Sequence, residues 1–161
     1  MKKIYLILIV LLLIPILITG CGNKDDKDTK SKAIDKYNEQ IIKIKEFKNL
    51  DIINDNTLET ILGINRNFVE SYAIGINKYN HEKLFAVIKP TKGQEDTIKL
   101  AMKLYIDEGK KQYKNQKFSK KEINYKKLYK NRLYKEYRGY QIYIVSENNN
   151  KNYNKIKRIV R

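Results

Sequence analysis

The chain of 161 residues is poor in the residue types that build many active sites. It has one histidine, so a zinc site made of several histidines is excluded. Its seven glycines are scattered and form no glycine-rich phosphate-binding loop. It also has a single cysteine, Cys21, which lies where a hydrophobic run gives way to charged residues. The position of this cysteine is informative about where the protein resides.

One long hydrophobic run is present, at the start of the sequence. Lys2 and Lys3 precede the uncharged residues 4–18, of which only Tyr5 and Pro15 are not aliphatic. As a helix this run would be about 22 Å long, short of a bilayer core of about 30 Å. A basic start, an apolar middle and small residues after it predict a secretory signal peptide. The alternative is a short transmembrane anchor with an incidental cysteine.

Residues 18–21, Ile-Thr-Gly-Cys, resemble the lipobox of bacterial lipoproteins, in which an aliphatic residue and two small ones precede a cysteine. The resemblance implies that the Cys21 thiol receives a diacylglyceryl group and that the chain is cut between Gly20 and Cys21. Acylation would consume the only thiol, leaving no thiol nucleophile, disulfide or cysteine-ligated metal site. Because two or more acyl chains anchor a protein stably, we expect a cell-membrane protein held by lipid on the extracytoplasmic face.

The composition changes abruptly after Cys21. Residues 22–31, GNKDDKDTKS, contain no hydrophobic side chain and predict a solvated tether. We therefore divide the chain into a signal peptide at 1–20, a lipidated cysteine and flexible tether at 21–32, and a single domain at 33–161.

The chain is strongly basic. It has 34 Lys and Arg residues against 18 Asp and Glu residues, a formal net charge of +16, which becomes +14 without Lys2 and Lys3. Such a surface attracts phosphate-rich polymers or anionic lipid head groups. A second explanation is codon composition, because Lys, Asn, Ile and Tyr dominate the chain and A/T-rich codons specify them. The export signal argues against nucleic acid as a partner.

Apolar residues at helical spacing predict most of the helices. The expected helices are an amphipathic helix over 33–50, a short helix capped by residues 55–57 and ended by Gly63, a long helix over 94–116, and a closing helix marked by Tyr153, Ile156, Ile159 and Val160. In the long helix Ile98, Ala101, Met102, Tyr105 and Gly109 share one face, and we expect Leu104 to widen it. Residues 119–130 are expected to form a short helix or turn, and residues 147–152 a turn.

Runs rich in aromatic and branched residues predict two β-hairpins. The first joins strands over 68–76 and 83–89, and the second joins 132–138 to 140–146 through Arg138-Gly139. In the last strand Tyr140, Ile142 and Ile144 are expected to face one way and Gln141, Tyr143 and Val145 the other. The sequence therefore predicts an α+β fold, with a small antiparallel sheet of about four strands and helices packed on one face.

Three segments resemble an uncharacterised domain of Firmicute lipoproteins, the domain of unknown function numbered 4358. They are the strand LFAVIK, the following segment IKLAMKLYIDEGKKQY, and the late stretch LYKNRLYKEYRGYQIYIVSEN. The resemblance covers roughly residues 57–159 and is a pattern of hydrophobicity and turns without a reactive motif. It implies an extracytoplasmic lipoprotein and a fold type, and it transfers no catalytic residue.

A catalytic site based on histidine or serine is not favoured. His81 lies in a polar stretch between two expected strands, which is typical of a surface turn. None of Ser71, Ser119 and Ser146 lies in a nucleophile-elbow sequence. We expect no metal and no cofactor.

Two carboxylate pairs are candidates for cleaving a glycan. Glu95 and Asp96 fall in the first turn of the long helix, where negative charge already favours the helix dipole. Asp107 and Glu108 are adjacent and lie among lysines, which is typical of a solvated ion-pair face. A wall hydrolase is therefore a remote alternative.

One basic cluster, interleaved with tyrosines, is a candidate polyanion-binding region, because cations neutralise phosphates and tyrosine rings stack on bases or sugars. The ordinary alternative is that the tyrosines pack in the core and the lysines coat a solvated face. Its cations are Lys110, Lys111, Lys114, Lys117, Lys120, Lys121, Lys126, Lys127, Lys130 and Arg132, continuing to Lys135 and Arg138.

These observations favour a non-enzymatic, lipid-anchored envelope protein that binds another component of the envelope. We expect that component to be a protein. The alternative is a module that binds polyanions or the membrane surface, with teichoic acid or anionic lipid as partner. An exposed apolar patch would distinguish the first hypothesis from the second.

Overall fold

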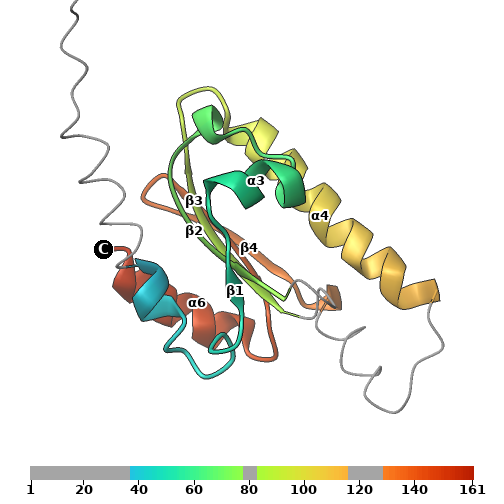
Figure 1. The fold of residues 1–161 in the computed structure, drawn as a ribbon. Coiled ribbons are helices and arrows are strands. Elements are labelled where there is room, and N and C mark those ends of the chain that lie inside the picture. Colours follow the sequence, from blue (N-terminus) through green and yellow to red (C-terminus); the bar gives the residue numbers. More distant parts are fainter. Residues whose placement is uncertain (1–36, 78–82, 116–128) are drawn as a thin grey trace, which may run out of the picture.

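A computed structural model describes residues 37–77, 83–115 and 129–161, with the side chains of 112–115 excepted. One antiparallel sheet forms the centre, with five strands in the order β1-β2-β3-β5-β4. Helix α4 lies along one side of the sheet and helix α6 along the other (Figure 1). The predicted α+β class is confirmed.

In the central strands, successive side chains point to opposite faces of the sheet, and both faces are buried. Strand β2 (Val69–Ile76) pairs with β3 (Leu84–Pro90), and β3 pairs in turn with β5 (Tyr140–Val145). Strand β4 (Leu133–Tyr137) completes the second hairpin at one edge. Arg138 and Gly139 make its turn with φ angles of 53° and 76°, so the predicted hairpin and its turn are confirmed.

A fifth strand, β1 (Asp51–Ile52), pairs with the end of β2 at the other edge. The sequence did not predict it, because two residues are too few to show an alternating pattern. It brings the chain to Asn54, which begins helix α3 (Asp55–Leu62). Asn54 and Thr57 bind each other's backbone N–H groups, and Gly63 ends the helix with a φ of 65°. The N-cap is thus Asn54, one residue before the predicted 55–57, whereas the predicted stop at Gly63 is confirmed.

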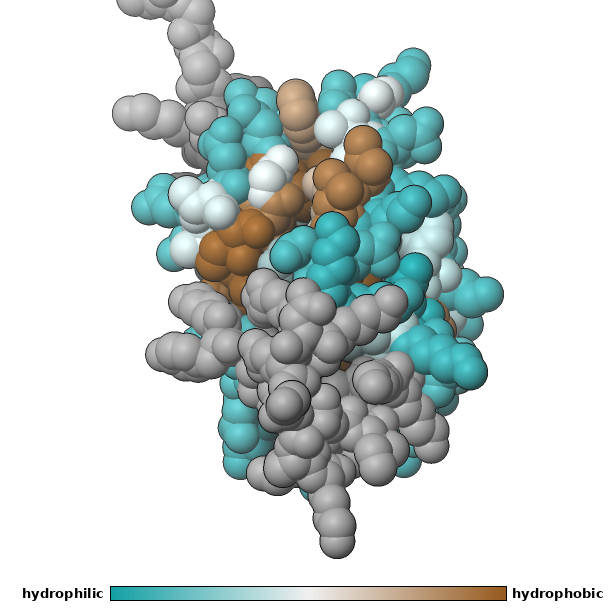
Figure 2. All heavy atoms as spheres, turned by 90° about the vertical axis from the view of Figure 1, so that its right-hand side faces the viewer, coloured by the Kyte–Doolittle hydropathy of each residue, from teal (hydrophilic) through white to brown (hydrophobic). Residues whose placement is uncertain are grey.

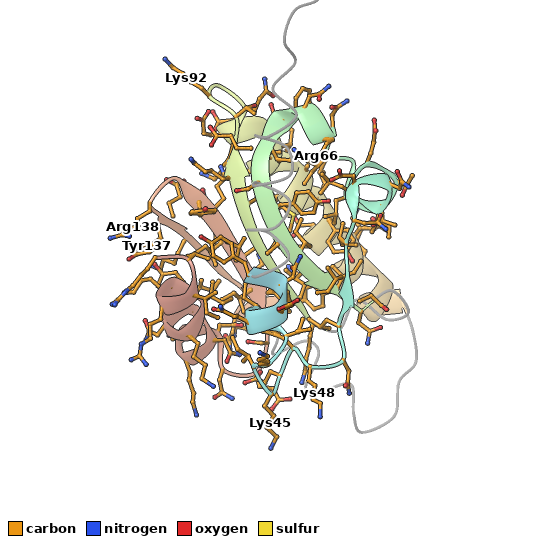
Figure 3. The ribbon with its side chains drawn as sticks, turned by 60° about the vertical axis from the view of Figure 1, so that its left-hand side comes forward. Lys45, Lys48, Arg66, Lys92, Tyr137 and Arg138 are labelled. Carbon is orange, nitrogen blue, oxygen red and sulfur yellow. The ribbon has the colours of Figure 1, made fainter. Side chains whose placement is uncertain are left out.

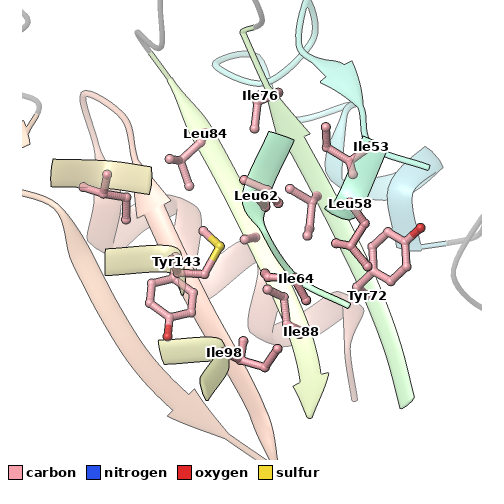
Figure 4. Packing of buried hydrophobic residues seen from close by; sticks show 14 of the residues in the cluster. Ile53, Leu58, Leu62, Ile64, Tyr72, Ile76, Leu84, Ile88, Ile98 and Tyr143 are labelled. Atoms are coloured by element: carbon pink, nitrogen blue, oxygen red, sulfur yellow. The ribbon is translucent and has the colours of Figure 1, made fainter. Parts of the chain in front are cut away.

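Helices cover both faces of the sheet, where the sequence predicted one. On the first face, α3, the short 3₁₀ helix η2 (Arg66–Phe68) and α4 (Glu95–Asn115) pack over alternate strand residues (Figure 4). The buried residues of this first core include Leu58, Leu62, Ile74, Ile76, Leu84, Ile88, Ile98, Met102, Ile106, Tyr143 and Val145. The intervening strand residues point to the opposite face and need a cover of their own.

The second core lies under α6 (Asn149–Ile159) and the segment 37–50. Its buried residues are Ile41, Ile44, Phe47, Ala73, Phe85, Val87, Ile142, Ile144, Ile156 and Val160. The predicted alternation of β5 is confirmed, because Ile142 and Ile144 belong to this core and Tyr143 and Val145 to the first. Within residues 147–152, which were predicted as a turn, helix α6 already begins at Asn149.

The expected helix over 33–50 is much shorter in the described part of the chain. Residues 37–41 are helical and the following residues form turns. Each turn is closed by a bond of the i to i+3 kind, from Ile44 N to Ile41 O, from Phe47 N to Ile44 O and from Leu50 N to Phe47 O. The apolar side chains recur every three residues, and this spacing suits three-residue turns better than an α-helix.

A glycine makes room for one of the two phenylalanine rings of the second core. Gly75 in β2 lies opposite Phe85 in β3, and a Cβ at Gly75 would come within 2.3 Å of the Phe85 ring. Phe47 then packs on Phe85 with ring centroids 5.2 Å apart. The segment 37–50 is therefore attached to the sheet through an aromatic contact that only glycine permits.

Candidate functional site

The predicted lipidation site, Gly20 and Cys21, lies outside the described residues. Within residues 37–77, 83–115 and 129–161, no helix is both long enough and apolar enough to cross a bilayer. The lipid anchor stays a prediction of the sequence.

The structure describes part of the predicted polyanion-binding cluster. Lys110 and Lys111 are exposed near the end of α4, and Lys130 and Arg132 are exposed just before β4. Lys114 lies in α4, where its side chain is not described, and Lys117, Lys120, Lys121, Lys126 and Lys127 lie outside the described residues. Lys135 of β4 and Arg138 of the following turn are exposed as well. Two of these six cations lie near carboxylates, with Lys111 Nζ at 3.6 Å from Glu108 and Arg132 at 3.7 Å from Asp107.

The residues considered as catalytic candidates take part in ion pairs or hydrogen bonds with other residues of the fold. Asp107 and Glu108 contact different cations, as expected for a solvated ion-pair face. Ser146 Oγ is buried, donates to Asn149 Oδ1 at 2.8 Å and accepts from Asn152 Nδ2 at 3.0 Å. This amide network fixes α6 to the end of β5. Among the described residues no group of three His, Cys, Asp or Glu side chains is placed to bind a metal ion, and His81 lies outside them.

The outer face of α4 carries two exposed leucines. Leu100 is 57% exposed and Leu104 is 61% exposed, one helical turn apart. The expectation that Leu104 widens the buried face is therefore wrong. On a helical wheel both leucines lie opposite Ile98 and Met102, so the sequence carried a signal that identifies them as outward-facing.

Half-buried apolar side chains extend this feature into a patch. Ile61 of α3, together with Ala101 and Tyr105 of α4, packs at the margin of the first core. Figure 2 looks onto this side and shows hydrophobic side chains gathered among hydrophilic ones. Burial raises the pKa of Tyr105 to about 12. We call Leu100 and Leu104, with Ala101 and Tyr105 next to them on the same helix, the α4 patch.

Charged side chains of both signs border the α4 patch. Asp96 and Lys103 are exposed one helical turn from Leu100, and Glu108 is exposed one turn beyond Leu104. Lys99 Nζ lies 5.1 Å from the centroid of the Tyr134 ring of β4, a distance typical of a cation–π contact. An apolar centre with a polar and charged rim is a common arrangement at a protein-binding surface.

Two shallow hollows lie at the two ends of strand β4. One, of about 770 Å³, lies between residues 131–135 at the start of β4 and residues 147–151 at the start of α6. The other, of about 540 Å³, lies beside the β4–β5 turn and contains the ion pair between Lys89 Nζ and Glu70 at 2.7 Å. The hydrogen bond to Glu70 raises the pKa of Lys89. The first hollow is lined mainly by polar side chains and the second also by Pro90, Tyr137 and Tyr140, and neither presents a recognisable catalytic arrangement.

Comparison with known proteins gives no further direction: no protein-family model, no curated protein and no solved structure matches the chain.

Proposed function

We propose that this chain is a lipid-anchored extracytoplasmic envelope protein that acts by binding, and that its α4 patch binds another envelope protein. The anchor follows from the lipobox-like residues ending at Cys21, and the resemblance to the lipoprotein domain of unknown function agrees with it. The observation that carries the binding function is the exposure of Leu100 and Leu104 on one face of α4. Clustered exposed apolar side chains on a small domain mark interaction surfaces more often than isolated ones do.

The chemistry of the patch defines the partner that it fits. Covering Leu100 and Leu104 removes apolar area from water, which favours an apolar surface on the partner. The rim carries Lys103 together with the carboxylates of Asp96 and Glu108, and so favours a partner whose own rim presents charges of both signs. The expected partner is therefore a protein with an apolar contact area bordered by charged side chains of both signs.

Site-specific photo-crosslinking in cells that make the full chain tests this proposal. A photoreactive residue at Lys103 should give one discrete crosslinked product, whose peptide on the partner is apolar and flanked by charged residues. The double variant Leu100→Ser, Leu104→Ser should lose the product, since the apolar contact is removed. The matched control Thr97→Ser changes an exposed residue of the same helix and should leave the product unchanged.

The result distinguishes the possible occupants of the patch. A product that joins two copies of this chain would assign the patch to self-association. A product that persists in the double variant would refute the proposal. Circular dichroism of each variant checks that the fold is retained, which we expect because both leucines are exposed.

A further inference from the structure

The outer face of α6 is basic along its whole length. Lys151, Lys155 and Arg158 are exposed and are spaced by four and three residues, so they form one row on the helix. Arg161 follows at the end of the chain and is exposed. No Asp or Glu occurs from Asn149 to Arg161. The row therefore has no acidic partner on its own helix, unlike α4, whose cations alternate with carboxylates.

Tyrosine rings and two further cations lie beside this row, on the flank of α6 that faces the second hairpin. Lys157 Nζ lies 5.7 Å from the centroids of both the Tyr137 and the Tyr153 rings. The Arg138 guanidinium lies 5.6 Å from the centroid of the Tyr137 ring. Both rings are half-buried, with their apolar bodies packed against the second core. Such rings suit the boundary between an apolar and an aqueous phase.

Segment 37–50, which covers the same face of the sheet as α6, adds exposed lysines to this side of the domain. One of its two acidic side chains, Glu46, is already hydrogen-bonded within the fold. Glu46 accepts from the backbone N–H of Glu147 at 2.7 Å and from Asn148 Nδ2 at 3.0 Å. Its carboxylate is thus used at the start of α6, and Lys45 and Lys48 beside it are exposed. Figure 3 shows these lysines at the lower end of the molecule and Tyr137 with Arg138 beyond the other side of α6. Glu39 is the remaining exposed acid of segment 37–50.

We propose that this surface, defined by Lys151, Lys155, Lys157, Arg158, Arg161 and Arg138 with the rings of Tyr137 and Tyr153, rests on anionic lipid head groups. We call it the α6 surface. Each cation near an anionic membrane contributes binding energy of electrostatic origin, and tyrosine rings favour the head-group layer. A row along one helix that lies flat on the sheet can contact a plane along its whole length.

The position of the chain's entry supports lipid as the occupant. The described domain begins at Tyr37, which packs in the second core beside Tyr140, in the same layer as α6. Residues 21–36, which include the predicted tether 21–32, connect Tyr37 to the proposed lipid on Cys21. Sixteen residues span at most about 55 Å, which keeps the domain close to the bilayer, and the basic surface would then orient it. The inference uses the proposed anchor here, whereas its charge argument depends on α6 alone.

Contact through the α6 surface would turn the α4 patch away from the bilayer. The two lie over opposite faces of the sheet (Figure 1). A partner protein could then reach Leu100 and Leu104 without competing with lipid.

Dye quenching on reconstituted vesicles tests the orientation. The mature lipoprotein is labelled at Asn154→Cys on α6 or at Thr97→Cys on α4, both exposed positions, and inserted into vesicles that carry a nitroxide on the lipid head group. We expect the dye at position 154 to be quenched in phosphatidylglycerol vesicles and much less in phosphatidylcholine vesicles. The dye at position 97 should be quenched in neither.

A charge variant supplies the quantitative test. Replacing Lys151, Lys155 and Arg158 by Gln should shift the contact equilibrium of position 154 by about 100-fold, at about fivefold for each cation. The matched control, Gln at Lys99, Lys110 and Lys111 of α4, removes the same charge and should leave the quenching unchanged. Equal quenching at both labels, equal quenching in neutral vesicles, or an unchanged charge variant would overturn the proposal.

Two further measurements distinguish lipid binding by the α6 surface from polymer binding and from a failure of the proposed lipid anchor. If the label at position 154 responds to soluble poly(glycerol phosphate) but not to vesicles, the α6 surface binds a polymer and the lipid assignment is wrong. The mass of the mature chain shows beforehand whether Cys21 is acylated. Without acylation the anchor fails, and the same fold-change is then measured with vesicles added to the free chain.

Discussion

The two sides of the sheet are closed in different ways. The α4 side is covered by α3, η2 and α4, which lie in the middle of the chain. The α6 side is covered by segment 37–50 and by α6, which come from the two ends of the described chain. Their outer faces differ as well, because α4 exposes leucines and mixed charges whereas α6 exposes cations, amides and half-buried tyrosines.

This difference shows which features of each side reflect folding and which suggest binding. Burying the first core needs only the inner face of α4, so folding does not require leucine at positions 100 and 104. Burying the second core likewise needs Ile156 and Val160 but not an unbroken basic face opposite them. Each outer face thus has a feature that packing does not require. On the α4 side this feature is a pair of exposed leucines, and on the α6 side it is a row of basic side chains.

The largest effect on the free energy of unfolding is expected from removing the contact between Phe47 and Phe85 on the α6 side of the sheet. Phe47→Ala removes a fully buried ring that packs on Phe85. Large aromatic truncations in cores cost about 3–5 kcal/mol, because a cavity remains where the ring was. Urea unfolding of the purified protein should show a loss of this size. The control Leu100→Ala on the α4 patch should change the free energy of unfolding by less than about 0.5 kcal/mol, and equal losses would mean that Leu100 is buried in the folded protein.

A smaller effect is expected from the long-range cap of α6. Glu46→Gln keeps the shape of the side chain but removes its charge from the start of the helix, which should cost about 1 kcal/mol. Partial burial opposes ionisation of Glu46, but hydrogen bonds from Asn148 and Glu147 outweigh it and lower its pKa below 4.5. Urea unfolding of wild type and variant at several pH values measures the difference.

The sign of the pH dependence follows from the lowered pKa of Glu46. Its stabilising contribution is fully present above the unfolded pKa and is lost as the pH falls from 4.5 through the folded pKa. The gap between wild type and Glu46→Gln should therefore be present at neutral pH and shrink in acid. Glu39→Gln, an exposed glutamate on the same segment, is the control, and a gap that grows in acid would contradict the cap.

The smallest effect is expected on the α4 side, at the ion pair between Arg132 and Asp107. The two groups are 3.7 Å apart and more than a third exposed. Such pairs contribute at most about 1 kcal/mol, and salt screens them. Asp107→Asn should lower the free energy of unfolding by less than that, and the difference should fall further in high salt. A larger loss that resists salt would show that this pair holds the end of α4 against the start of β4.

Much of the fold could be predicted from local pattern. The alternating residues of β5, the Arg138-Gly139 turn, the stop at Gly63 and the long helix from Glu95 were all visible in the sequence, since each depends on neighbours within a few residues. The two-residue strand β1 and the turns after Ile41 could not be found this way. Both depend on contacts with β2 or Phe85, which are distant in the sequence.

The two candidate surfaces also differ in how far the sequence alone could identify them. Leu100 and Leu104 were detectable on a helical wheel, because their exposure follows from the period of one helix. The α6 surface was not, because Arg138 and Tyr137 of β4 meet Lys157 only when α6 packs beside the hairpin.

The sequence by itself determined the antiparallel hairpins, the main helices and their inward faces, through hydrophobic period and turn chemistry that act over a few residues. It also contains the lipobox-like residues on which the proposed anchor depends. Only the tertiary structure decided that helices cover both faces of the sheet, that Glu46 caps a helix beginning at Asn149, and that the apolar and basic surfaces lie on opposite sides. The physical reason is that the central strands β2, β3 and β5 bury both of their faces, so segments from the two ends of the domain must meet over the second face.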